Sequence, residues 1–171
     1  RVSLAVPDVG DPFVHALYAT YISYLPSDAF AYALTQRTDP RGALAELLKS
    51  PHIGQIFVSR THPGITRGHH YHDTKVEKFV VLEGDAVIRF RHIMTEGRGQ
   101  RAEGGDQRSE VRDQQAGVIE YRVRGEEFRV VDIPPGYTHS IENVGQNDLI
   151  VLFWADEIFN SEISDTFSLP V

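Results

Sequence analysis

Four side chains of kinds that bind metal ions lie in two short, widely separated stretches of the chain. His70 and His72 are separated by one residue, Glu77 follows soon after them, and His139 lies much further along. Alternate side chains of a β-strand share one face, so both imidazoles of the first stretch can point to one place. Three imidazole nitrogens and one carboxylate suit a divalent ion such as zinc, iron, nickel, copper or manganese. The two stretches therefore predict the halves of one metal site.

The elements that must position these ligands are predicted to be β-strands. Glu77 opens an apolar run in which Phe79 and Val81 share its face, and a carboxylate on a buried face needs a partner such as a bound cation. His139 follows a rigid Pro-Pro-Gly turn, residues 134–136, at the entry to another strand. Short strands at close spacing, separated by turn residues, indicate an antiparallel barrel or a double-sheet roll.

The spacing of both stretches resembles the cupin family. Residues 64–84 fit the first cupin motif, G-x5-H-x-H-x4-E-x6-G, and residues 134–143 fit P-x-G-x2-H-x3-N. The glycine that usually starts the second motif is replaced by Phe128, and we expect Gly125 to provide that turn. The resemblance implies a mainly β fold, a cupin of the double-stranded β-helix or jelly-roll barrel type. It implies the metal ligands His70, His72, Glu77 and His139.

Composition and charge exclude several classes of protein. The chain has 171 residues, of which 41% are hydrophobic, enough for the core of one domain. The net charge of −7 argues against nucleic-acid binding, and no apolar run is long enough to predict a membrane span. The sequence contains no cysteine and no visible signal peptide, so we expect a cytoplasmic location without disulfides. The chain begins with Arg1, which suggests a piece cut from a longer protein.

Residues 1–51 are predicted to form an arm with two short helices. The first helix starts at Asp11 and Pro12 and stops before Pro26, and a strand is expected over residues 30–34. A similar start at residues 39–40 precedes a leucine stripe typical of a second helix, formed by Leu44, Leu47 and Leu48. We expect this aromatic-rich arm to cover the barrel or a partner subunit; the alternative is a tyrosine-lined platform for a sugar.

Residues 52–171 are predicted to form the barrel. Alternating apolar residues predict a strand over residues 55–60 and a β-hairpin over residues 77–92, turning at Gly84. Residues 94–117 are polar and predict a long flexible hairpin loop. Further strands are expected over residues 119–123, 128–133, 138–144 and 149–154, whereas the tail, residues 156–171, shows no period.

A longer part of the chain resembles the C-terminal cupin domain of bacterial capsular polysaccharide enzymes of the CapF/WbjC type. The resemblance is carried by residues 54–93, 118–123, 130–145 and 152–159, and extends to the arm. In that family a short-chain dehydrogenase/reductase domain precedes the cupin. Its nucleotide-binding glycine motif is not found here, so we expect this chain to bind no NAD(P). The polar loop of residues 94–117 is a departure from the family pattern.

The resemblance implies an isomerase domain of a bifunctional enzyme in capsular or O-antigen polysaccharide biosynthesis. The cupin would epimerise C3 of a UDP-linked 4-keto-6-deoxy-N-acetylhexosamine. The NADPH-dependent reductase domain would then reduce the C4 ketone, on the route to UDP-N-acetyl-L-fucosamine. Zinc is the expected metal, and a homodimer is the expected assembly.

Epimerisation next to a ketone needs groups that remove a proton and return one. The candidates for proton transfer are His92, Tyr137, Lys75 and Lys78, and the residues that could contact the substrate are Arg60, Arg67 and His69. The two arginines could bind the diphosphate. The competing interpretations are a core histidine at position 92, solvated lysines, and arginines in surface ion pairs.

Two other classes of function fit the same residues. Histidines and a carboxylate with open positions also describe a non-haem metal dioxygenase, for which redox-active iron and oxygen uptake would be diagnostic. A non-catalytic cupin that binds sugar or holds a dimer together would leave a UDP-4-keto sugar unchanged.

Overall fold

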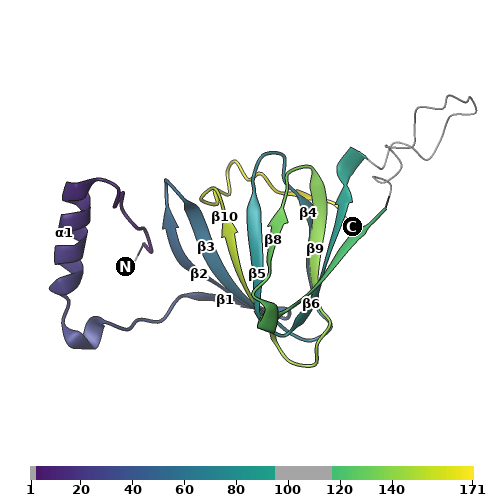
Figure 1. Cartoon of the computed structure of the whole chain (residues 1–171), viewed down its shortest axis with the longest axis horizontal. Helices are drawn as coiled ribbons and strands as arrows, with labels where there is room; N and C mark the ends of the chain where they lie inside the picture. The colour runs from purple at the N-terminus through teal and green to yellow at the C-terminus, as the bar shows by residue number, and fades with distance from the viewer. Residues whose placement is uncertain (1–2, 95–116) are drawn as a thin grey trace, which may run out of the picture.

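Two antiparallel sheets face each other in the computed structural model, which describes residues 3–94 and 117–171 (Figure 1). The first sheet has the order β1-β2-β3-β10-β5-β8, with bounds Gln36–Asp39, Gly42–Ser50, Gly54–Thr61, Leu149–Ala155, Glu77–Glu83 and Val130–Ile133. The second has the order β11-β4-β9-β6-β7, with bounds Phe167–Ser168, Thr66–Tyr71, Tyr137–Asn143, Asp85–His92 and Ile119–Arg124. This arrangement is the mainly β, cupin-like barrel that the two motifs predicted.

The core lies between the two sheets. Strand β5 buries Phe79 and Val81, and β6 buries Ile88 and Phe90, because alternate side chains of each strand point inward. Burial of such side chains stabilises the fold by about 1.5–3 kcal/mol each. The same inward face of β5 carries Glu77, so the alternation that builds the core also places a carboxylate inside the barrel.

The predicted hairpin over residues 77–92 is wrong, although its turn exists. Gly84 turns the chain with a φ of 91°, but β5 pairs with β10 and β8 while β6 pairs with β9 and β7. The turn therefore carries the chain from one sheet to the other. Alternating apolar residues have the same appearance in a hairpin and in two strands of facing sheets.

The predicted second helix is also wrong, because residues 36–50 form β1 and β2, which extend the first sheet. A bulge between Glu46 and Leu48 shifts the register of β2 against β3. Such a bulge adds one residue to a strand, so that apolar positions recur at the spacing of a helical stripe. Residues 30–34 form no strand, since β1 begins at Gln36.

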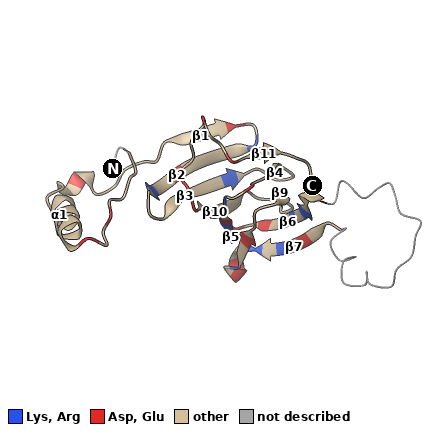
Figure 2. Cartoon of the chain, turned by 90° about the horizontal axis from the view of Figure 1, so that it is seen from above, with Lys and Arg blue, Asp and Glu red and all other residues tan. Residues whose placement is uncertain are grey.

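The first predicted helix is present as α1, Pro12–Ser23. The side chain of Asp11 caps its start by accepting hydrogen bonds from the N–H groups of Phe13 and Val14. A 3-10 turn, η1 (Ser27–Ala29), follows it. Helix α1 stands apart from the barrel (Figure 1), has no buried residue in the described chain, and carries no charged residue (Figure 2). No helix of the described residues is long and apolar enough to cross a membrane.

Two further expectations concern the loops. The polar loop predicted over residues 94–117 lies almost entirely outside the described residues. Phe128, at the end of the 3-10 turn η4 (Gly125–Glu127), itself adopts a left-handed backbone with a φ of 45°. This residue, rather than Gly125, takes the left-handed conformation at the place where the second motif usually has its glycine.

Candidate metal centre

Three strands from the two facing sheets position the candidate ligands. Strand β4 carries His70, with His72 just beyond its end; β9 carries His139; and β5 of the other sheet begins at Glu77. The register of β4 against β9 shifts between Gly68 and His70, which brings His70 directly opposite His139. Directly opposite residues in an antiparallel pair point to the same face, here the barrel interior.

Gly68 makes the close approach of β4 to β9 possible. Its φ is 98°, and a Cβ atom at this position would lie 2.7 Å from the carbonyl oxygen of His139. Any larger side chain would push the two strands apart. The glycine therefore keeps the two opposed histidines within reach of a common ion.

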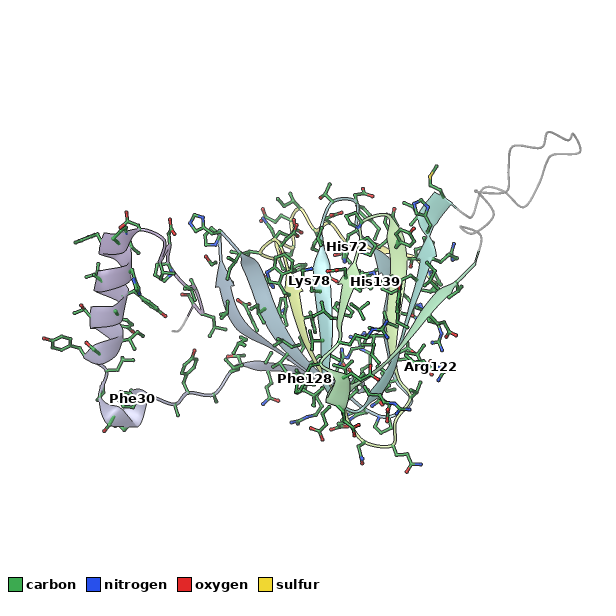
Figure 3. All side chains as sticks on the ribbon, in the orientation of Figure 1. Phe30, His72, Lys78, Arg122, Phe128 and His139 are labelled. Carbon is green, nitrogen blue, oxygen red and sulfur yellow. The ribbon has the colours of Figure 1, made fainter. Side chains whose placement is uncertain are left out.

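The four side chains converge within the barrel. One ligand atom from each of His70, His72, Glu77 and His139 lies within 4.8 Å of the others. The Oε2 atom of Glu77 is 3.4 Å from Nε2 of His72 and 3.7 Å from Nε2 of His139. Tetrahedral zinc, with bonds of about 2.1 Å, places its ligand atoms roughly 3.4 Å apart. Figure 3 shows His72 and His139 close together between the sheets.

The hydrogen bonds of the histidines leave the inward nitrogens available. Nδ1 of His72 lies 2.5 Å from the backbone oxygen of Asp165, to which it can donate, so that Nε2 carries the lone pair. Nε2 of His72 and Nε2 of His139 are buried, and neither has a hydrogen-bond partner among the described residues. A buried polar atom without a partner is costly. A bound cation would satisfy both nitrogens, so the donor set fits a divalent metal.

Electrostatics keeps these groups in their metal-binding forms. Burial lowers the pKa of His139 from 6.5 to about 3, with a further contribution from His70, and burial also lowers the pKa of His70. Burial alone would raise the pKa of Glu77, but the interactions with His72, His139 and Lys75 outweigh it, and the pKa is lowered. The imidazoles of His70 and His139 are therefore neutral and the carboxylate of Glu77 is ionised near neutral pH.

The loop between His72 and Glu77 is held by the carboxylate of Asp165 in the C-terminal tail. This carboxylate accepts hydrogen bonds of 2.8 Å from the N–H groups of Asp73, Thr74 and Lys75, and one of 3.0 Å from the Thr74 hydroxyl. These four bonds lower the pKa of Asp165 against the effect of its partial burial. The backbone oxygen of Asp165 also accepts a hydrogen bond from Nδ1 of His72. Asp165 therefore holds the loop between His72 and Glu77 through both its side chain and its backbone.

Two cavities meet at the cluster. An inner cavity of about 130 Å³ lies inside the barrel, and its lining includes His70, Glu77, His139 and the aromatic rings of Phe79 and Phe153. An outer cleft of about 350 Å³ shares His70 and Glu77 with it. The cleft runs over the inner face of the first sheet, below the tail residues 157–159. The cluster is therefore accessible to a ligand that enters through the cleft.

Of the four candidates for proton transfer, the structure brings Lys75 to the cluster. Its side chain is buried and lines the cleft; Nζ donates to the Thr166 hydroxyl at 3.1 Å and lies 3.9 Å from Oε1 of Glu77. Lys78 points outward and forms an ion pair with Asp132. His92 and Tyr137 pack edge to face, with centroids 4.8 Å apart, and line neither of the two cavities as far as the described residues show.

The candidate substrate contacts lie in different places. Arg60 is exposed, and its Nε is 3.7 Å from the carboxylate of Asp148. Arg67 lines the inner cavity, donates from Nε to the Thr61 hydroxyl at 2.9 Å, and has a lowered pKa because of burial. His69 adopts a left-handed backbone with a φ of 61° and is exposed outside the barrel.

Several residues of the cluster's surroundings and of the cleft that leads to it were not found by sequence reasoning. Asp165 lies in the tail, which shows no periodic signal. Arg37 and Lys49 line the cleft, but they lie in the segment predicted to be a helical arm. Recognition of β1 and β2 as strands would have placed these two cations on the inner face of the sheet.

The fold and the cluster define a cupin with a site able to hold a metal ion. The chain belongs to the polysaccharide biosynthesis C-terminal domain family, which matches residues 37–116 and 104–167.

Relatives of known name are similar to the whole chain. The UDP-2-acetamido-2,6-beta-L-arabino-hexul-4-ose reductase of Pseudomonas aeruginosa is 39% identical over 171 residues, which are 100% of this chain and 41% of that protein. The crystal structure of the capsular polysaccharide assembling protein CapF from Staphylococcus aureus has a TM-score of 0.84 and 40% identity, covering 99% of this chain and 41% of that one. The chain thus spans about two fifths of these relatives.

The cupin domain of Cnp3 from Schizosaccharomyces pombe has a TM-score of 0.51 at 13% identity, over 78% of this chain and 85% of that one. This distant likeness supports the fold.

Proposed function

We propose that this domain catalyses metal-dependent epimerisation at C3 of a UDP-linked 4-keto-6-deoxy-N-acetylhexosamine. The observation that carries the proposal is the pair of buried, unpartnered Nε2 atoms of His72 and His139 beside Glu77, where the cleft meets the barrel interior. The name of the Pseudomonas aeruginosa relative specifies a UDP-linked hexose with a ketone at C4, which supports this class of substrate.

The reaction follows from the acidity of a carbon next to a ketone. Loss of the C3 proton gives an enolate, and return of a proton to the opposite face of C3 inverts the centre. His70, His72, Glu77 and His139 would hold a divalent ion, most simply zinc, whose charge stabilises negative charge on the ketone oxygen. The side chains of this chain must then bind the sugar, exclude water and move the proton.

Lys75 is the group that we assign to proton transfer. It lies in the cleft next to the ligand Glu77, and its ammonium group already donates one hydrogen bond, to Thr166. Its other two hydrogens can reach a bound substrate. In this assignment a water molecule in the cleft takes the C3 proton from one face and passes it to solvent. Lys75 then delivers a proton to the opposite face of C3 and regains one from solvent.

Solvent-deuterium exchange tests the proposal. Purified protein in D2O should incorporate one deuterium at C3 of the UDP-4-keto sugar, detected by mass spectrometry and NMR. Chelator and the variant His139→Ala should each abolish the incorporation, with metal content measured in parallel. Exchange that persists in metal-free His139→Ala protein would remove the metal from the mechanism. Absence of any exchange in the metal-loaded protein would favour a non-catalytic domain, and oxygen uptake would favour a dioxygenase.

A matched pair of lysines tests the role of Lys75. Lys75→Met should lower the rate of inversion at C3, followed by NMR, by about 10²-fold or more while the metal stays bound, as expected for loss of a general acid. Lys78→Met, on the outer side of β5, should invert C3 at the wild-type rate. Equal rates for the two variants would exclude Lys75.

The larger assembly is part of the same proposal. We propose that an NADPH-dependent reductase domain precedes this domain in the full protein, which acts in the cytoplasm as a homodimer. This chain covers 41% of each of the two relatives, so the rest of their length is sufficient for such a domain.

A further inference from the structure

The floor of the cleft is made of side chains from four neighbouring strands. Glu77 is paired with Ala155, Ala155 with Gln55, and Gln55 with Lys49, so these residues form one row across the inner face of the first sheet. Neighbouring strands are about 4.8 Å apart, so Lys49 lies roughly 14 Å from Glu77 along this row. The ligand cluster thus stands at one end of a long floor.

A parallel row extends one strand further. Val151 is paired with Ser59, Ser59 with Leu44, and Leu44 with Arg37 on β1. Arg37 and Lys49 therefore share the inner face with Glu77 and line the same cleft, at the end away from the cluster. Between the two ends the lining is mixed, with the apolar Leu44, Phe57 and Phe159 beside the polar Gln55 and Glu46.

The two cations at the far end of the cleft, Lys49 and Arg37, differ in whether an acidic side chain pairs with them. Nζ of Lys49 is 3.0 Å from Oε1 of Glu46, so this cation is partly neutralised, although its other hydrogens remain available. Arg37 has no hydrogen bond or ion pair from its side chain within the described part of the chain, and it is exposed. The cleft also contains Glu157, so it is not a uniformly basic surface. Arg37 is the described cation of the cleft whose charge is left without a partner.

We infer that Arg37 and Lys49 bind the diphosphate of a nucleoside diphosphate sugar whose sugar ring reaches the ligand cluster. A planar guanidinium matches phosphate oxygens with two parallel hydrogen bonds, and an ammonium group adds a point charge. The floor between the cluster and these two cations is long enough to hold the sugar ring, so the nucleoside would lie beyond the cations. The identity of the sugar in this inference rests on the proposed function. The binding of a diphosphate rests only on Arg37 and Lys49.

The inference differs from the prediction made for Arg60 and Arg67. Arg60 is paired with Ala43 and Ile150 on the opposite face of the same sheet and lies near Asp148. Arg67 is held by Thr61 in the inner cavity. Neither arginine lines the outer cleft in the described chain, so neither is placed to meet a ligand along its floor.

Binding of UDP, measured by isothermal titration calorimetry, tests the inference without turnover. The protein is treated with chelator so that phosphate cannot coordinate a metal, and uridine is titrated in parallel. Arg37→Ala should weaken UDP binding about 10-fold or more, the effect expected for loss of hydrogen bonds to a charged group, while uridine binding is unchanged. Lys49→Met should weaken UDP binding less, because Glu46 already shares that charge.

Arg60→Ala is the matched control from the other face and should bind UDP as the wild type does. Wild-type affinity in Arg37→Ala would overturn the inference, as would a loss in Arg60→Ala or Arg67→Ala without one in Arg37→Ala. Deuterium exchange separates this result from the proposed function. UDP binding that depends on Arg37 in a protein without exchange would contradict the epimerase alone, and exchange with UDP binding independent of Arg37 would contradict the subsite alone.

Discussion

Three of the four candidate ligands are prepared for a metal by their surroundings. The carbonyl of Asp165 directs the Nδ1 proton of His72 away from the cluster, whereas His139 is made neutral by burial among the other histidines. Glu77 stays ionised in spite of its burial because imidazoles and Lys75 surround it. The cluster is therefore organised before any ion arrives, which reduces the cost of binding one.

The low pKa of His139 predicts how the metal-free protein responds to acid. The unfolded chain takes up a proton at this imidazole near pH 6.5 and the folded chain only near pH 3, so stability is fully present above pH 6.5 and falls as the pH drops towards 3. Between pH 8 and pH 5 the loss from this residue is about 2 kcal/mol. Urea unfolding of chelator-treated protein should show this loss.

The control for this prediction is His139→Gln, which does not titrate. Its free energy of unfolding should fall by about 2 kcal/mol less over the same pH range. Equal falls in the two proteins would mean that His139 titrates normally in the folded state.

At this scale the sequence predicted the four side chains that the structure brings together, but not their surroundings. Motif spacing encodes strand alternation and turn length, so His70, His72, Glu77 and His139 could be found without coordinates. Which faces of a strand meet a cleft depends on the sheets, so Lys75 could not be separated from Lys78. The sequence predicted a turn near Phe128 and assigned it to Gly125. It did not reveal that Phe128 itself adopts the left-handed conformation.

Among the elements, the C-terminal tail has the clearest role in the site. We predict that Asp165→Asn weakens zinc binding by about 10-fold or more, the usual effect of losing a partner that orients metal ligands. An amide keeps one oxygen acceptor, so it cannot serve both the N–H group of Asp73, which bonds one oxygen, and those of Thr74 and Lys75, which bond the other. Competition titration with a chromophoric chelator measures the affinity.

Asp132→Asn, which changes an exposed carboxylate on β8, controls for the loss of charge and should bind zinc normally. The absorption spectrum of bound cobalt gives a second measurement, since a displaced ligand alters it. Wild-type zinc affinity and an unchanged cobalt spectrum in Asp165→Asn would show that the tail does not position the ligands.

Strand positions were predicted well where alternation is regular and poorly where it is interrupted. Strand β3 was predicted nearly to its bounds, and β7 to β10 were recognised with shifts of a few residues at their ends. In β2 the bulge gave the apolar residues of a strand the spacing of a helix. At Gly84 no sequence pattern indicated that the chain passes from one sheet to the other. Both failures concern long-range pairing, which local patterns do not contain.

In the whole molecule, residues 3–34, which precede β1, are held to the barrel by few contacts. Residues 4–6 run beside β2, with backbone hydrogen bonds of 3.0 Å from Lys49 to Leu4 and 2.8 Å from Val6 to Lys49. Helix α1 buries none of its residues, and Phe13 and Tyr24 are 75% and 84% exposed. An apolar helix of this length is marginal in water, so we propose that a second copy of the chain covers it.

Deletion of residues 1–34 should therefore convert a dimer into a monomer without unfolding the barrel. We expect the midpoint of thermal unfolding at low protein concentration to fall by no more than about 4 °C, because few contacts within the chain are lost. Sedimentation velocity and scanning calorimetry measure the two effects. A truncated protein that remains dimeric would show that the arm does not mediate assembly.

Glu77 belongs to one sheet, and His70 and His139 belong to the other. An ion in this position would cross-link the two sheets, so its binding would raise the free energy of unfolding of the whole barrel. Starvation for the metal would then reduce the amount of intact protein in the cell.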